Sequence, residues 1–270
     1  MRKWKVLFFL LIYSFSCWAA TLSVQNNLQL WLKADAGVTV TGGYVSNWAD
    51  QSGNGRNASQ SDTSKRPVLA SNAINGLAAI RFDGSNDGLL TSAFQTFPNK
   101  RGTMFIVAKA AFDGTTGHMV GTYYNSGITW QFYHNQDTLL YWDSVSADTI
   151  SGSIVNSEFK TYSIVRDSNT NINFYRNGEF QTNFAIADNQ PDVKAVNIGS
   201  NINHSNLEAF HGDIAEILLY GSNLSESERI SVEQYLGEKY FNISPVPEPC
   251  SVLLVFFSIF IFISSNLQRK

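Results

Sequence analysis

The segment from Ile172 to Gln181 constrains the fold most, because its residue pattern is that of a β-hairpin. Apolar and polar residues alternate on both sides of Asn177-Gly178. An Asn-Gly pair between two alternating runs is typical of a two-residue type I′ turn, in which both residues take positive φ angles. The sequence therefore predicts two antiparallel strands joined at Asn177 and Gly178.

Similar short apolar runs recur along the chain, separated by Gly, Asn, Asp and Ser. We expect further strands at residues 28–32, 78–82, 103–108, 119–124, 128–133, 138–142, 161–166, 196–198 and 212–220. One helix is expected at residues 225–241, where Ser225 and Glu228 have capping-box spacing before an apolar stripe. Many short strands with turns between them predict an all-β fold, an antiparallel sandwich or barrel.

Five motifs follow one another in an order that is characteristic of one superfamily. They are Leu30–Asp35, Trp48–Gly55, Phe82–Gly84, Phe174–Gly178, and Gly212–Tyr220 with Leu224–Glu226 and the helix behind it. In these motifs the chain resembles the concanavalin A-like, laminin-G-like jelly rolls over nearly all of residues 28–241. The resemblance implies an all-β, two-sheet antiparallel jelly-roll sandwich with one C-terminal helix. It implies little about function, because the superfamily includes lectins, glycosidases, adhesion modules and spacers.

The N-terminus has the three parts of a secretory signal peptide. Arg2, Lys3 and Lys5 precede an apolar run at residues 6–15, and Cys17-Trp18-Ala19 offers small residues at −3 and −1. We therefore expect a signal peptide at residues 1–19 that signal peptidase cuts between Ala19 and Ala20. Cys17 could instead indicate a lipoprotein, but the residues before it match a lipobox poorly.

The C-terminus has a proline-rich hinge, an apolar run and a basic end. The run Val252–Ile263 spans ~18 Å as a helix, which is short for a hydrocarbon core of ~30 Å. Residues 245–270 resemble the PEP-CTERM sorting signal of Gram-negative bacteria, with Pro247, Glu248 and Pro249 as the motif and Cys250 as a departure from the usual pattern. The resemblance implies an inner-membrane stage, processing by exosortase, and a place at the cell surface or in an exopolysaccharide matrix. A plain tail anchor is the alternative.

Charge and cysteine content restrict the domain between these ends, residues 20–244. The whole chain has 19 basic and 22 acidic side chains, and removal of the two ends leaves 14 basic and 21 acidic ones. A net charge of −7 without clustered Lys or Arg argues against nucleic acid as a partner. Both cysteines lie in the ends, so the domain has to fold without disulfides.

No catalytic constellation is evident in the sequence. The Glu-x-Asp-x-x-Glu pattern of the superfamily's glycosidases and the Gly-x-Ser-x-Gly elbow are missing, and the four histidines lack zinc-ligand spacing. Asp213 and Glu216 are three residues apart, so a regular strand would point them to opposite faces. We therefore expect a non-catalytic protein.

Two Asp-containing loops are the candidate metal site. Asp50 lies in a Gly- and Asn-rich loop, and Asp83 and Asp87 flank Gly84-Ser85-Asn86. Oxygen ligands on tight loops suit Ca²⁺, and related jelly rolls often bind calcium in such loops. The alternative is that the three carboxylates cap turns by accepting backbone N–H groups.

Aromatic residues that cluster in sequence are the candidate glycan platform. Tyr124, Trp130, Tyr133 and Trp142 lie on neighbouring predicted strands, so some of them are expected to face outward. The alternative is that they belong to the core, as we expect for Trp31 and Trp48.

Our interpretation is an exported, non-catalytic surface or matrix protein that binds a glycan or another surface component. The alternatives are a structural coat or spacer without a ligand, or a carbohydrate-active enzyme.

Overall fold

The computed structural model describes residues 20–111, 116–124, 127–135, 138–142, 147–153, 158–167, 171–185, 193–200 and 208–242. For residues 99, 123–124, 127–129, 140–142 and 147–153 it describes the backbone alone. Residues 1–19, including Ala19, and the segment with Pro247, Glu248 and Pro249 lie outside this part of the chain. Within it, no helix is both long and apolar enough to cross a membrane.

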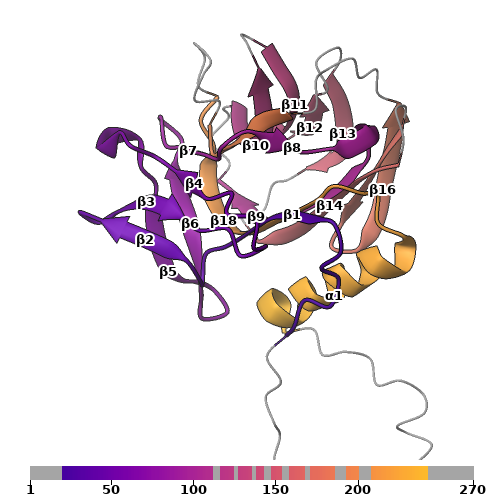
Figure 1. Ribbon diagram of the computed structural model, residues 1–270, viewed down its shortest axis with the longest axis horizontal. Coiled ribbons are helices and arrows are strands. Elements are labelled where there is room, and N and C mark those ends of the chain that lie inside the picture. The colour runs from indigo at the N-terminus through magenta and orange to yellow at the C-terminus, as the bar shows by residue number, and fades with distance from the viewer. Residues whose placement is uncertain are drawn as a thin grey trace, which may run out of the picture.

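Two antiparallel sheets face each other, and the helix α1 (Glu226–Phe241) covers the outside of one of them (Figure 1). The first sheet has eight strands in the order β16-β15-β14-β9-β18-β6-β5, with β1 also paired to β18. Its strands are β1 (Leu28–Lys33), β5 (Val68–Ile74), β6 (Leu77–Asp83), β9 (Gly102–Ala110), β14 (Lys160–Arg166), β15 (Asn171–Arg176), β16 (Glu179–Ala185) and β18 (His211–Tyr220).

The second sheet has ten strands in the order β13-β12-β11-β10-β17-β7-β4-β3-β2, with β8 also paired to β17. Its strands are β2 (Val38–Thr41), β3 (Tyr44–Trp48), β4 (Ala58–Ser59), β7 (Leu89–Leu90), β8 (Phe94–Gln95), β10 (Thr116–Tyr124), β11 (Gly127–Asn135), β12 (Thr138–Trp142), β13 (Ala147–Ser153) and β17 (Val193–Ile198). Two short 3-10 helices, η1 (Thr63–Lys65) and η2 (Pro98–Lys100), lie in the connections. The predicted two-sheet jelly-roll sandwich is confirmed.

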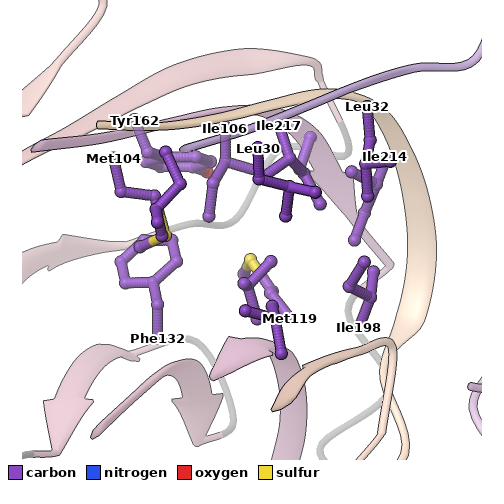
Figure 2. Close-up of a cluster of buried hydrophobic side chains, with 14 of the residues drawn as sticks. Leu30, Leu32, Met104, Ile106, Met119, Phe132, Tyr162, Ile198, Ile214 and Ile217 are labelled. Atoms are coloured by element: carbon purple, nitrogen blue, oxygen red, sulfur yellow. The ribbon is translucent and has the colours of Figure 1, made fainter. Parts of the chain in front are cut away.

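The core between the sheets is built by inward-facing residues of both. Figure 2 shows Leu30, Ile106 and Ile217 of the first sheet opposite Met119 and Ile198 of the second. Each of these side chains is almost completely buried. Burying one such side chain stabilises the fold by ~1.5–3 kcal/mol. The apolar core can therefore stabilise this domain, which has no cysteine and so no disulfide.

Both local predictions with defined geometry are confirmed. Asn177 and Gly178 connect β15 to β16 with φ angles of 53° and 81°, as a type I′ turn requires. The helix α1 (Glu226–Phe241) starts at Ser225, which accepts a hydrogen bond from the backbone of Glu228 while the Glu228 side chain accepts one from the Ser225 backbone. The capping box therefore fixes the N-terminus of α1.

A β-bulge in β18 contradicts the expectation that Asp213 and Glu216 point to opposite faces. The register shifts between Ile214 and Glu216, and Ile214 and Ile217 both belong to the core between the sheets. Asp213 and Glu216 therefore both lie on the outer face. The bulge occurs where β18 exchanges its partner, because residues 211–214 pair with β6 and residues 216–220 pair with β1. The extra residue of a bulge interrupts the regular alternation of side chains, so Asp213 and Glu216 can share one face.

The outer face of the first sheet packs against α1. Phe105 and Leu218 of the sheet meet Val232, Leu236 and Tyr240 of the helix in a second apolar cluster. The described chain begins and ends beside this helix, since Ala20 and Asn242 line one surface cleft there. Figure 1 shows the same arrangement, with both ends of the described chain next to α1.

Candidate functional site

The predicted aromatic platform on β10–β12 is wrong where the structure describes its side chains. Trp130 is 2% exposed and packs against Phe97 at 5.1 Å between ring centroids, so it belongs to the core. Tyr133 is also buried. The side chains of Tyr124 and Trp142 lie outside the described part. The expectation for Trp48 is confirmed, because Trp48 is completely buried in the core.

Asp50 holds the loop that follows β3. One carboxylate oxygen accepts the backbone N–H groups of Trp31 and Ser52 at 3.0 and 2.9 Å. The other accepts the backbone N–H of Arg56 at 3.0 Å and the Ser52 hydroxyl at 2.8 Å. Four donors occupy the four lone-pair directions of one carboxylate. The alternative expectation, that Asp50 caps a turn, is therefore confirmed.

Asp83 and Asp87 also accept backbone N–H groups. Asp83 Oδ1 accepts from Ser85 at 2.8 Å and from Asn86 at 3.3 Å, and Asp87 Oδ2 accepts from the backbone of Asp83 at 3.0 Å. These bonds close the loop around Gly84, whose φ of 78° favours a residue without a side chain. Among the described residues, no three His, Cys, Asp or Glu side chains come together to hold a metal ion. Calcium binding by Asp50, Asp83 and Asp87 stays a prediction.

Asp83 and Asp87 line a surface cleft of ≈ 590 Å³, which we call the β3–β6 cleft. Its other lining residues come from β3, η1 and the residue after η1, β5, β6 and β18: Tyr44, Thr63, Ser64, Arg66, Val68, Arg81, Phe82 and His211. Most of these side chains are polar or charged, and one exposed ring accompanies them. Such a lining suits a polar ligand that also offers an apolar face.

Backbone hydrogen bonds bring these distant segments together. The N–H of Val45 donates to the carbonyl of Pro67 at 2.7 Å, and the N–H of Gly88 donates to the carbonyl of Lys65 at 3.0 Å. His211 lies opposite Asp83 in the β18–β6 ladder. A Cβ on Gly84 would lie 2.8 Å from Cβ of His211, so the glycine lets the loop approach β18. The cleft wall is therefore part of the packed sandwich.

Tyr44 presents the aromatic surface of the cleft. It follows Gly42 and Gly43, which have φ angles of 63° and 93° and form the turn between β2 and β3. The turn places Tyr44 at the start of β3, where 48% of its surface is exposed. A half-exposed tyrosine offers both a ring face and a hydroxyl to a ligand.

Arg81 is held by a buried carboxylate. Its Nε and Nη2 donate to Asp213 at 2.7 and 3.0 Å, and Lys109 binds the same carboxylate at 2.9 Å. Burial alone would raise the pKa of Asp213, but hydrogen bonds from Arg81 and Lys109 outweigh burial and hold the pKa below its usual range. Two cations therefore share one permanent anion beside the cleft.

Asp87 is the most perturbed acid in the cleft. Only 7% of its surface is exposed, and burial, followed by the nearby charge of Asp83, raises the pKa of its carboxyl group to about 6. The hydrogen bond from the backbone of Asp83 opposes this shift but is the smallest contribution. The charge of the cleft therefore changes in mildly acidic solution.

A second cleft of ≈ 580 Å³ lies beside α1 and contains Trp31. Other side chains of the protein already contact the Trp31 ring. Lys33 Nζ lies 4.5 Å from the Trp31 ring centroid, and Tyr235 stands edge-on to the same ring at 6.3 Å. The β3–β6 cleft is therefore the better candidate for a ligand.

Comparisons with known proteins give the fold but no family. No protein-family model matches the chain. No curated protein has a significantly similar sequence. Solved structures do match, with the Trypanosoma rangeli sialidase in complex with sialic acid at a TM-score of 0.58 and 14% identity over 78% of this chain.

Botulinum neurotoxin binding domains match with similar TM-scores. The binding domain of neurotoxin DC in complex with rat synaptotagmin II has a TM-score of 0.58 and 11% identity over 79% of this chain. The type G receptor binding domain has a TM-score of 0.54 and 13% identity over 78%. This chain spans 33% of the sialidase and 52% and 51% of the two neurotoxin chains. At such low identity the similarity shows a shared β-sandwich fold alone.

Proposed function

We propose that this protein is an exported, non-catalytic surface or matrix protein that binds a glycan in the β3–β6 cleft. The observation that carries the proposal is the position of Tyr44, a half-exposed ring at the edge of a cleft lined by hydrogen-bonding side chains. Sugar rings have apolar C–H faces and hydroxyl edges. An amphipathic ring beside polar groups matches both surfaces.

The position of the chain ends supports display on a surface. Ala20 and Asn242 both line the cleft beside α1, whereas the β3–β6 cleft is formed by other strands. In Figure 1 strands β2, β3 and β5 lie on one side of the sandwich, whereas both ends of the described chain lie next to α1. A protein tethered through residues 245–270 would therefore keep the β3–β6 cleft accessible. Export through residues 1–19, and sorting by exosortase through Pro247–Pro249, are part of the same proposal.

Two structural neighbours recognise glycans. The sialidase binds sialic acid in its complex, and cell entry of botulinum neurotoxin type C depends on interaction with two ganglioside molecules. These ligands belong to those proteins. They support glycan recognition as one use to which the sandwich is put.

The non-catalytic part of the proposal is supported by the two acids that the bulge places on one face. Asp213 is bound by Arg81 and Lys109, and Glu216 is completely buried and accepts four hydrogen bonds. Neither carboxylate is free to act on a glycosidic bond, which would need two accessible carboxyl groups at a defined separation.

A panel of polysaccharides tests the proposed function. The full-length protein is melted with each polymer at saturation, where a concentration about 100 times Kd stabilises the native state by ~2.7 kcal/mol. For a chain of this size the midpoint should rise by roughly 5–10 °C with at least one polymer. A midpoint that no polymer changes would favour the structural coat or spacer alternative.

A further inference from the structure

The guanidinium group of Arg81 is fixed along one edge and free along the other. Nε and Nη2 donate to the two oxygens of Asp213. Within the described part of the chain, Nη1 has no hydrogen-bond partner, and 52% of the side chain is exposed. Because Asp213 also binds Lys109, its single negative charge does not cancel both cations. Arg81 therefore presents a positioned donor with net positive charge around it.

Arg66 has the same arrangement with different partners. Its Nε donates to the carbonyl of Gln60 at 2.7 Å, and its Nη2 donates to the carbonyl of Ser61 at 3.0 Å. These partners are neutral. Among the described residues no acid forms an ion pair with the guanidinium group, and Asp62 is near enough to interact with its charge. Nη1 of Arg66 likewise makes no hydrogen bond there. The cleft is thus lined by two arginines that are each held in place and each keep one nitrogen for a ligand.

The acidic residues of the cleft are engaged with their own loop. Asp83 Oδ1 accepts two backbone N–H groups, and Asp87 Oδ2 accepts one. A charge-assisted bond from arginine to a carboxylate is roughly twice as strong as a neutral hydrogen bond. The unused donors of Arg66 and Arg81 would be satisfied best by an anion that the protein does not itself supply.

We propose that the β3–β6 cleft recognises the carboxylate of an acidic sugar through Nη1 of Arg66 and Arg81, while the Tyr44 ring contacts the sugar face. This inference rests on the proposed glycan-binding function and assigns it a ligand class, polysaccharides with uronic acid units. Asp83 and Asp87 line the same cleft, so Arg66 and Arg81 balance their charge and leave the lining close to neutral. The domain's more distant negative charges do not prevent binding, because charges beyond ~8 Å are largely screened at physiological salt.

Binding of matched polymers to the full-length protein tests the inference. Polygalacturonate and alginate are compared with the same polymers after full esterification, at 0.15 M salt, and dextran sulfate is included as a sulfated polyanion. The acidic form should bind about tenfold more tightly than its ester. Arg66→Gln and Arg81→Gln should each remove most of this preference. Arg101→Gln, which changes an exposed arginine outside the cleft lining, should keep it.

Each other outcome overturns the inference in a distinct way. Equal affinity for the acidic polymer and its ester would exclude recognition of the carboxylate. If Tyr44→Ala then binds neither polymer, the cleft is still the glycan site. A preference that survives in both Arg66→Gln and Arg81→Gln would place recognition elsewhere. Dextran sulfate binding with equal affinity and equal arginine dependence would show a general polyanion site. A protein that binds none of these polymers and no member of the polysaccharide panel would contradict the proposed function as well. Arg66→Gln alone decides the test if Arg81→Gln does not fold.

Discussion

Nζ of Lys239 lies 2.7 Å from Oε2 of Glu216, which is completely buried between β18 and α1. The same carboxylate accepts the hydroxyls of Tyr235 and Tyr240 at 2.8 and 2.6 Å and the indole N–H of Trp31 at 2.6 Å. Burial, followed by the charge of Glu216, raises the pKa of both tyrosines above the usual range, so they remain donors. One buried acid therefore connects the helix to the sheet.

Replacing this acid should destabilise the domain strongly. Glu216→Gln removes the charge that Lys239 faces and presents an amide N–H₂ group to donors. Breaking a buried ion pair costs about 3–5 kcal/mol. We expect a loss of that order in the free energy of unfolding, measured in urea. Glu226→Gln, an exposed change in the first turn of α1, is the control and should cost less than ~1 kcal/mol. Equal losses in the two variants would contradict the role of Glu216.

Asp50 should stabilise its loop without calcium. Asp50→Ala removes the acceptor of four hydrogen bonds and should lower the free energy of unfolding by on the order of 2 kcal/mol. Asp50→Asn keeps one acceptor oxygen and should lose less. We expect the same loss in EDTA and in Ca²⁺, as judged by thermal melting. A loss that occurs only with Ca²⁺ present would show that Asp50 is a metal ligand.

Asp87 should make stability depend on pH in the direction opposite to most acids. Its native pKa of about 6 exceeds that of an unfolded Asp, ~3.9, so the native state binds the proton more tightly. Its contribution to stability is present below pH ~4 and is lost as the pH rises to about 6. Asp87→Asn keeps an acceptor for the backbone of Asp83 and has no proton to lose. The variant should therefore gain stability relative to the wild type between pH 4 and pH 7, by on the order of 2 kcal/mol.

Asp62 provides the matched control for this pH experiment. Hydrogen bonds from the side chain and backbone of Ser64 lower the pKa of Asp62. Its contribution to stability is therefore present at neutral pH and is lost as the pH falls. Asp62→Asn should lose stability relative to the wild type as the pH rises, the reverse of Asp87→Asn. The same trend in both variants would refute the assignment of the raised pKa to Asp87.

Local features were predictable from the sequence because neighbouring residues determine them. The Asn177-Gly178 turn and the Ser225 cap of α1 are each formed by residues at most three positions apart. Features that depend on residues distant in the chain were not predictable from the sequence. The bulge after Ile214 arises where β18 exchanges β6 for β1, and Trp130 is covered by Phe97 from another part of the chain. An alternating run shows that a residue lies on one face but not which face is covered.

Most residues of the β3–β6 cleft were likewise not predictable, because they come from distant parts of the chain. Its acidic residues, Asp83 and Asp87, were noticed because they flank a glycine-containing turn. Tyr44, Arg66 and His211 were missed, because they are separated by more than 20 residues from one another and meet only through sheet pairing. The Gly42-Gly43 pair before Tyr44 was the one local signal, since two adjacent glycines between alternating runs indicate a hairpin turn.

The most direct measurement of the central proposal is the affinity of the Tyr44→Ala variant for the polysaccharide that stabilises the wild type most. Phe180→Ala is the control, because Phe180 is also an exposed aromatic residue, at 55%, and does not line the cleft. Titration calorimetry on the full-length proteins should show at least a tenfold loss for Tyr44→Ala and little change for Phe180→Ala. Unchanged affinity in Tyr44→Ala, with the fold intact by circular dichroism, would contradict glycan binding in the β3–β6 cleft.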